Sequence, residues 1–515
     1  MLKDSRTSES FQEAASLYSA IRQPGAGQIS DAAEIHVAPS GSQAVFSGTM
    51  VDALDGTPPT RICGVDLRSG DVRVLTFGPN TDRLPKYSPS GGLVGFLSDR
   101  HDAGDFQLYL LDPASGAASA APRVEGWVEY FHWSPDGKKI LLGIAGHGAD
   151  VSGGQGAVRS QRPGGGAASW TPIVESADER LSARWAWVFD LETAYVQPVA
   201  GDGDNIWEAV WCGNASIAAV VSPGSDEGAW YSARLHIIDI DTGRGREIYE
   251  PGDQLGWPTC SASGRQLAVV EGICSDRWIV AGELRVIDTT TGNALLVDTQ
   301  GLDVTYTEWR SDTQLLLAGH RGFWTVVGLY DSALGVFNEI WSRKDLSVGG
   351  YYAVVSGIAD SGDCALVGES YVRAPEIGVV RDGEYSVVRS FDLGYAEQAR
   401  VIRDIESVTW TAPDGLEIQG WLLLPEGRRP HPLVMHVHGG PVQLSRPVWL
   451  ARRSMAALML VKKGYAVFFP NPRGSAGRGR DFVLPVRGDL GGADTYDLLS
   501  GLDDLVDRGI ADPER

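Results

Sequence analysis

Cysteine is scarce in this sequence of 515 residues, which contains only five. The five are widely separated and none belongs to a C-x-x-C pair: Cys63, Cys212, Cys260, Cys274 and Cys364. An odd number of scattered cysteines fits neither a disulfide framework nor a cysteine metal site. We therefore expect reduced, buried thiols, no metal and a cytoplasmic location.

Long apolar runs and excess positive charge are also missing. No segment reaches the ~18 consecutive apolar residues of a membrane span, and the polar residues 1–6 predict that no signal peptide is present. The 44 Lys and Arg face 66 Asp and Glu, a formal net charge of −22. Such a polyanion repels nucleic acid and anionic membranes, so we expect neither as a partner.

Glycine and aromatic residues, in contrast, are abundant, with 64 Gly, 16 Trp, 16 Tyr and 13 Phe. Many tight turns combined with many large rings are typical of all-β proteins. A chain of this length exceeds a single hydrophobic core, so we expect at least two domains.

One turn signal recurs with a period of about fifty residues, which indicates a repeat architecture. The signal is an aromatic-Ser-Pro-x-Gly turn followed by an apolar run, and it is clearest at 87–91 and 133–137. Its copies end at residues 41, 91, 137, 213, 264, 312 and 362. Each turn is followed by an apolar strand, a strand ending in an Asp-containing turn such as 238–243, and a short last strand.

With one more strand before the turn, each unit has four strands. Seven units predict a seven-bladed β-propeller over residues 31–400, after a helical extension over 1–30. An insertion over about 146–180 is either a surface loop or a loop folded toward a ligand. A propeller does not by itself name a function, and residues 30–400 contain no clear catalytic cluster.

The pattern changes after residue 400. A hairpin is expected to turn at Pro413-Asp414-Gly415, buried strands at 432–437 and 465–469, and helices over 449–463 and 493–508. The second helix would place Leu498, Leu499, Leu502 and Leu505 on one side. Strands alternating with helices predict a doubly wound, mostly parallel α/β sheet over 401–515.

Two glycine-rich loops follow the buried strands, where open α/β sheets place their ligands. In His438-Gly439-Gly440-Pro441, adjacent glycines let a backbone N–H approach a substrate oxygen, as in an oxyanion hole; a plain tight turn is the alternative. The loop at 471–477 has neither a G-x-x-x-x-G-K-[ST] nor a G-x-G-x-x-G spacing, which argues against phosphate binding. We expect no cofactor.

Together these segments resemble the prolyl oligopeptidase family of serine peptidases, closest to its acylaminoacyl-peptidase and dipeptidyl-aminopeptidase-like branch. The family combines a propeller with an α/β-hydrolase domain, so the resemblance extends over nearly the whole chain. It rests on Trp410-x-x-Pro413-Asp414-Gly415 with Gly420-Trp421, on His438-Gly439-Gly440-Pro441, on Asn471-Pro472-Arg473-Gly474-Ser475, and on Arg487-Gly488-Asp489 leading to residues 512–515.

The resemblance implies roles for single residues. Gly439 would supply an N–H to the oxyanion hole, while His438, Gly440, Pro441, Arg473 and Gly474 would form the active-site loops, with Arg473 bracing them. A catalytic-base role for His438 is not expected. The propeller would cap the active site and admit only short or unfolded peptides.

The family's nucleophile elbow, G-x-S-x-G, is not found in the sequence. In the family's order the Ser, Asp and His would all lie beyond Arg515, so we expect the 515 residues alone to be inactive and their C-terminal part to be unstable. The expected partners are a peptide substrate and a C-terminal hydrolase chain that completes the domain. The sequence leaves the oligomeric state open. Two alternatives remain, a non-enzymatic propeller that binds peptides or proteins, and an ester or amide hydrolase on the same fold.

Overall fold

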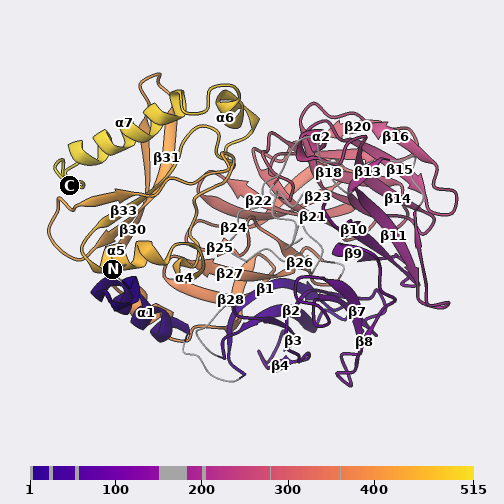
Figure 1. The fold of residues 1–515 in the computed structure, drawn as a ribbon. Helices are drawn as coiled ribbons and strands as arrows, with labels where there is room; N and C mark the ends of the chain where they lie inside the picture. Colours follow the sequence, from indigo (N-terminus) through magenta and orange to yellow (C-terminus); the bar gives the residue numbers. More distant parts are fainter. Residues whose placement is uncertain are drawn as a thin grey trace.

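The structure is a computed structural model that describes residues 4–22, 27–52, 57–149, 183–199, 204–278, 280–359 and 361–515. The greater part of the predicted insertion, from residue 150 onward, lies outside the described residues. Figure 1 shows two bodies side by side: a large group of β-sheets, and a smaller body of strands and helices built from the last part of the chain.

Strands β1–β29, which we call the seven-sheet region, form seven antiparallel sheets among the described residues. The first three sheets contain β1 (Ile29–Val37), β2 (Gln43–Met50), β3 (Thr60–Asp66) and β4 (Val72–Val74); β5 (Asp82–Tyr87), β6 (Val94–Ser98), β7 (Gln107–Leu111) and β8 (Ala118–Ala120); and β9 (Trp127–Trp133), β10 (Lys139–Ala145), β11 (Arg184–Asp190) and β12 (Tyr195–Pro198).

The next two sheets contain β13 (Asn205–Cys212), β14 (Ser216–Ser222), β15 (Arg234–Asp239) and β16 (Gly245–Tyr249); and β17 (Gln254–Cys260), β18 (Gln266–Gly272), β19 (Glu283–Asp288) and β20 (Ala294–Leu296). The last two contain β21 (Asp303–Trp309), β22 (Gln314–Arg321), β23 (Trp324–Asp331) and β24 (Val336–Arg343); and β25 (Ser347–Val348), β26 (Val355–Gly357), β27 (Cys364–Ser370), β28 (Arg373–Arg381) and β29 (Glu384–Ser390). A short helix, α2 (Glu227–Trp230), follows β14.

The predicted turns are confirmed, because each joins two neighbouring strands of one sheet. Glycines at the turn ends, such as Gly91 and Gly137, have φ of 74° and 70°, a region that favours glycine. The Asp-containing turns are stabilised in a common way: the Asp66 carboxylate accepts from the N–H groups of Arg68 and Ser69, each at 2.9 Å.

Indole side chains of the turn signal connect consecutive sheets. Trp133 Nε1 donates to the carbonyl of Lys86 on the preceding sheet at 3.0 Å, and Trp211 Nε1 donates to that of His132 at 2.9 Å. The first strands contact one another in sequence, and β1 contacts β26–β28 of the last sheet, so the series closes into a ring of propeller type.

The remaining elements form the C-terminal region and the N-terminal helices. They are η1 (Ser5–Thr7), α1 (Glu9–Arg22), α3 (Tyr395–Ala399), β30 (Ile402–Thr411), β31 (Glu417–Pro425), β32 (Leu433–Met435), α4 (Leu450–Arg453), α5 (Met455–Lys462), β33 (Ala466–Asn471), α6 (Arg480–Val483), η2 (Leu484–Val486) and α7 (Ala493–Asp507). Helix α1 packs Leu17 and Ile21 into the same apolar cluster as Trp449 and Leu450, so the N-terminal helix lies against the C-terminal region.

The sheet of the C-terminal region has the order β30-β31-β33-β32. The hairpin predicted at Pro413-Asp414-Gly415 is confirmed. The prediction of a mostly parallel sheet is wrong for the described strands, because only β32 and β33 are paired in parallel. The physical reason is that β30–β31 is a tight hairpin and β33 lies beside β31 in the opposite direction, so parallel pairing begins only at β32.

Two helix predictions need correction. The helix predicted over 449–463 is divided into α4 and α5 at Ser454, whose φ of −156° is not helical. Arg452 of helix α4 pairs with Glu369 of the seven-sheet region, whereas α5 buries Leu458 and Val461 against the sheet of the C-terminal region. In α7, Leu499 is exposed, because the inward face is formed by Asp497, Gly501 and Leu505.

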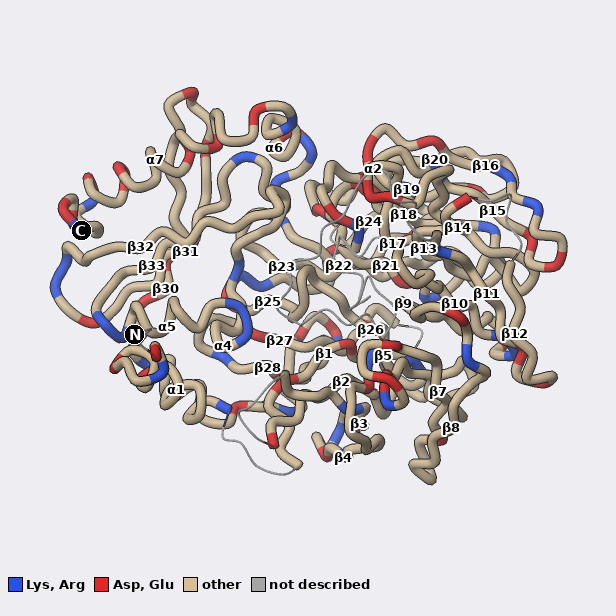
Figure 2. The backbone as a smooth tube through the Cα atoms, in the orientation of Figure 1, with Lys and Arg blue, Asp and Glu red and all other residues tan. Residues whose placement is uncertain are grey.

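No helix among the described residues is long and apolar enough to cross a membrane. Figure 2 shows basic residues on α4 and near α6, on the side of the C-terminal region that faces the seven sheets. These basic residues therefore lie near the contact between the two bodies, where the candidate site is found.

Candidate active site

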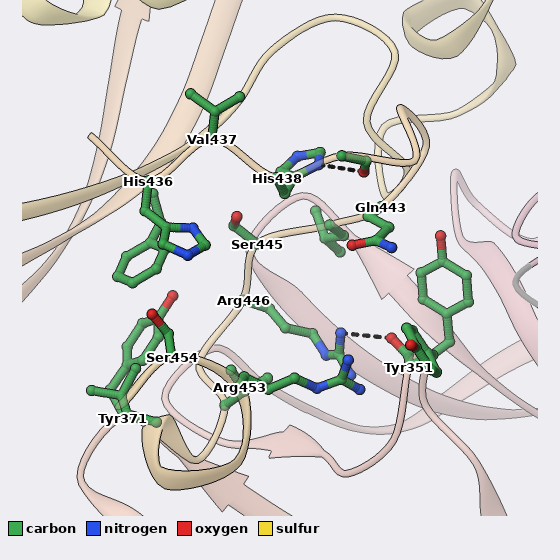
Figure 3. A pocket seen from close by; sticks show the side chains of 16 residues that line it. Tyr351, Tyr371, His436, Val437, His438, Gln443, Ser445, Arg446, Arg453 and Ser454 are labelled. Atoms are coloured by element: carbon green, nitrogen blue, oxygen red, sulfur yellow. Dashed lines mark hydrogen bonds between the residues drawn. The ribbon is translucent and has the colours of Figure 1, made fainter. Parts of the chain in front are cut away.

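A cavity of about 290 Å³ opens where the C-terminal region meets the seven-sheet region. Figure 3 shows its lining, in which His436, Val437 and His438 come from the end of β32 and Tyr351 comes from the opposite body. The lining residues are Tyr351, Tyr352, Tyr371, His436, Val437, His438, Gly439, Gln443, Leu444, Ser445, Arg446, Val448, Leu450, Arg453, Ser454 and Phe469. Residues that are far apart in the sequence therefore line the same cavity.

The loop at 438–441 leaves its backbone donors unengaged. Gly439 is exposed, and within the described chain no acceptor is found for the N–H groups of Gly439 and Gly440. Gly440 has φ of 97°, and a Cβ there would lie 2.8 Å from Gln443 Cγ, so glycine is required. The Gly440 carbonyl accepts from the Ser275 hydroxyl, which fixes the loop to the seven-sheet region.

Both ring nitrogens of His438 lie close to polar groups, and burial lowers its pKa. Nδ1 lies 3.1 Å from the Gly439 carbonyl, which only accepts, so Nδ1 carries the proton of the neutral ring. Nε2, 3.1 Å from Ser475 Oγ, is then an acceptor, but the same hydroxyl donates to Pro472 O at 2.7 Å. Ser475 is fully buried and outside the cavity lining. The pair is thus arranged to orient the loop rather than to attack a substrate.

Arg473 and Gly474 are not among the residues that line the cavity. The Arg473 side chain donates to Asp497 from Nε at 2.9 Å and Nη2 at 2.7 Å, and to Asp414 from Nη1 at 2.7 Å. Its two carboxylate partners raise its pKa. Gly474 has φ of 98° and packs against Val486. Arg473 thereby connects α7, the 413–415 turn and the loop after β33.

Arginines that sequence reasoning missed form the floor of the cavity. Arg446 is buried and donates to the carbonyls of Tyr351 at 2.8 Å and Gly350 at 2.7 Å. Burial lowers its pKa to about 10. Arg453 also donates to the Gly350 carbonyl at 2.7 Å, and its guanidinium stands 4.4 Å from the centre of the Tyr351 ring. No local motif marks these residues, because their partners come from the other body.

Further polar contacts hold the two bodies together beside the cavity. Arg452 pairs with Asp31 and, at 3.2 Å, with the fully buried Glu369. Asp303 Oδ2 accepts from the N–H of Gly477 at 2.5 Å. The cavity is therefore enclosed by contacts from both sides.

The fold and the loop define the class of protein: a propeller-type ring of sheets joined to a smaller α/β region, with a glycine-rich loop after a strand. Among the described residues, no group of three or more His, Cys, Asp or Glu is arranged to hold a metal ion.

Comparison with known proteins makes the class specific. Residues 452–515 match the profile of the Prolyl oligopeptidase family. The uncharacterized peptidase YuxL of Bacillus subtilis is 24% identical over 93% of this chain and 75% of its own length. Dipeptidyl-peptidase 5 of Porphyromonas gingivalis is 20% identical over 95% of this chain and 73% of its own length. The family match and these relatives support the prolyl oligopeptidase family for this chain.

A solved structure shares the fold across both bodies. It is an acylaminoacyl peptidase in complex with Z-Gly-Gly-Phe-chloromethyl ketone, with a TM-score of 0.69 at 17% identity, covering 95% of this chain and 72% of that one. At this identity the likeness is one of fold.

Proposed function

We propose that this protein is a serine peptidase that hydrolyses short peptides in an acylaminoacyl- or aminopeptidase-like manner. The observation that carries the proposal is the cavity lined by His438 and Gly439 between the two bodies, where the N–H of Gly439 has no acceptor among the described residues. Such donors stabilise the oxyanion that forms when a peptide carbonyl is attacked. The peptide-like inhibitor in the related acylaminoacyl peptidase adds support for a peptide substrate.

In this proposal each of the seven sheets is one blade of a seven-bladed propeller over 31–400, and 401–515 is part of the hydrolase domain. The propeller limits access to the cavity, because Tyr351 and Tyr352 line it from that side. Tyr352 Oη also donates to the carbonyl of Val442 at 2.8 Å, which keeps the propeller wall against the loop. A long folded substrate would have to break these contacts to reach the loop. A cytoplasmic location stays a prediction from the sequence.

The nucleophile is proposed to come from residues outside this sequence, since no G-x-S-x-G occurs within it. Two observations support a position for the missing strand and its nucleophile beside β32. Residues 510–512 bond to His431 in parallel register, and the N–H of Leu433 donates to the Arg515 carbonyl at 3.1 Å. A strand in this direction along β32 would end beside His438 and Gly439. The 515 residues alone would then form no acyl-enzyme.

The test uses the full product of the native gene with Gly439→Pro and Gly439→Ala variants, assayed on acetyl-alanine and dipeptide p-nitroanilides. Proline removes the N–H, so we expect kcat to fall by about 10²–10³ with a smaller change in KM. Alanine keeps the N–H, and its Cβ would meet no atom within 4 Å, so we expect near-normal kcat. Equal unfolding midpoints show that the loop stays folded. Full activity of the proline variant, or an equal loss in both, would reject the role of Gly439.

A further inference from the structure

A second cavity, of about 220 Å³, lies within the seven-sheet region and shares no lining residue with the first. It is bordered by the first strands of successive sheets, from β5 to β21, and by the loop that carries Trp278. Its lining includes four large aromatic residues, Tyr130, Trp257, Trp278 and Tyr306. The peptidase function proposed above does not use this space.

Three of the aromatic rings contact one another in series, from Tyr130 through Trp278 to Trp257. The ring centres of Tyr130 and Trp278 are 5.9 Å apart, and those of Trp257 and Trp278 are 6.2 Å apart, with interplanar angles of 51° and 58°. Trp257 is fixed in place because its Nε1 donates to the Val280 carbonyl at 2.8 Å. A cation is attracted when it lies over the face of an indole or phenol ring within about 6 Å of the ring centre.

One carboxyl group stands in this aromatic wall. Glu208 is 7% exposed, and its Oε2 accepts from the N–H of Trp257 at 3.1 Å. Its Oε1 is buried without a hydrogen-bond partner among the described residues. Burial raises the pKa of Glu208 to about 7. An unpaired carboxylate oxygen inside a protein is costly, and a bound donor would offset the cost.

The nearby cations do not fill this position. Arg277 pairs with Glu129 at 3.5 Å, and Lys86, which also lines the cavity, donates to the Phe131 carbonyl at 2.9 Å. Neither bonds to Glu208 Oε1. The Oε1 acceptor of this cavity-lining residue therefore has no partner among the described residues.

We propose that this cavity binds a small organic ammonium ion, whose N–H groups donate to Glu208 and whose charge lies against the indoles of Trp257 and Trp278. The carboxylate selects the charge, and the apolar wall selects an alkyl or aromatic body of limited size. A free amine and the N-terminal ammonium of a short peptide share this chemistry. The site is separate from the proposed active site.

The first experiment titrates phenethylammonium and its neutral counterpart 2-phenylethanol into the full native-gene product, by calorimetry and tryptophan fluorescence. We expect saturable binding of the amine with a change in indole emission, and binding of the alcohol weaker by about 10- to 100-fold. Equal binding of the two, or no binding of either at millimolar concentration, would overturn the proposal. This comparison needs no variant.

A second experiment assigns the binding to Glu208. Glu208→Gln keeps the shape and removes the charge, so it should weaken amine binding by about 10-fold or more, whereas Glu384→Gln, at an exposed position on β29, should leave it unchanged. Unaltered binding by the Glu208→Gln protein would refute the site. If glycyl-phenylalanine amide competes with phenethylammonium and its N-acetyl form does not, the ligand is the amine of a peptide. If phenethylammonium binds and the peptide does not compete, the ligand is a free amine.

Discussion

Replacing Arg473 by methionine should destabilise the C-terminal region by about 3–5 kcal/mol, because it leaves a buried carboxylate without its cation. Asp497 is fully buried, and it would lose two side-chain hydrogen bonds, from Nε and Nη2, and keep only the Arg473 backbone N–H at 2.8 Å. Methionine matches the aliphatic stem of arginine, so the packing change is small. The perturbation is therefore mainly electrostatic.

The assay is urea unfolding followed by tryptophan fluorescence. Trp410 reports on the site directly, since its Nε1 donates to the Asp497 carbonyl at 2.8 Å. Arg508→Met is the matched control: Arg508 is 40% exposed and pairs with Asp504 one turn away, so its loss should cost about 0.5 kcal/mol or less. If the two variants unfold within about 1 kcal/mol of each other, the reasoning on the buried pair is refuted.

The same variant makes a prediction about pH. Hydrogen bonds from Arg473 hold the pKa of Asp414 at about 2, below its ordinary 3.8. A depressed pKa in the folded state contributes stability above pH 3.8, which is lost as the pH falls toward 2. The advantage of the parent protein over Arg473→Met should therefore shrink across this window. A constant difference from pH 5 down to pH 2 would contradict the assignment.

Two further predictions concern contacts within and between the bodies. Arg452→Met should cost about 3–5 kcal/mol and speed limited proteolysis between the bodies, because Glu369 is fully buried beside it, whereas the exposed Arg400→Met should change neither. Unchanged proteolysis would contradict this. Cys212 and Cys260 have sulfur atoms 3.4 Å apart, so a diazene oxidant such as diamide should convert this pair to a disulfide, seen as loss of two titratable thiols that Cys260→Ser prevents. Retention of both thiols would show that the pair does not close.

The parts of the fold that local chemistry determines could be predicted from the sequence. The turn signals predicted the strand pairings because glycine at positions such as Gly91 and Asp side chains such as Asp66 act on neighbouring residues. The 413–415 hairpin is local in the same sense. In contrast, the break at Ser454 depends on arginines of α4 that reach a different body, which periodicity within one helix does not contain.

The candidate site could be predicted only in part, for a related reason. The 438–441 loop was visible because adjacent glycines follow a buried strand. Arg446 and Tyr351 were not, because their contact joins segments far apart in the sequence. The inward face of α7 was misjudged at Leu499, since the pattern of leucines did not reveal that Asp497 is turned inward to meet Arg473.

The proposed serine-peptidase activity is tested most directly by labelling the full product of the native gene with a fluorophosphonate and locating the modified residue by mass spectrometry. We expect one modified serine, outside the 515 residues, and loss of p-nitroanilide hydrolysis in step with labelling. A label within the 515 residues, for example on Ser475 beside His438, or peptide hydrolysis that the reagent leaves untouched, would contradict it.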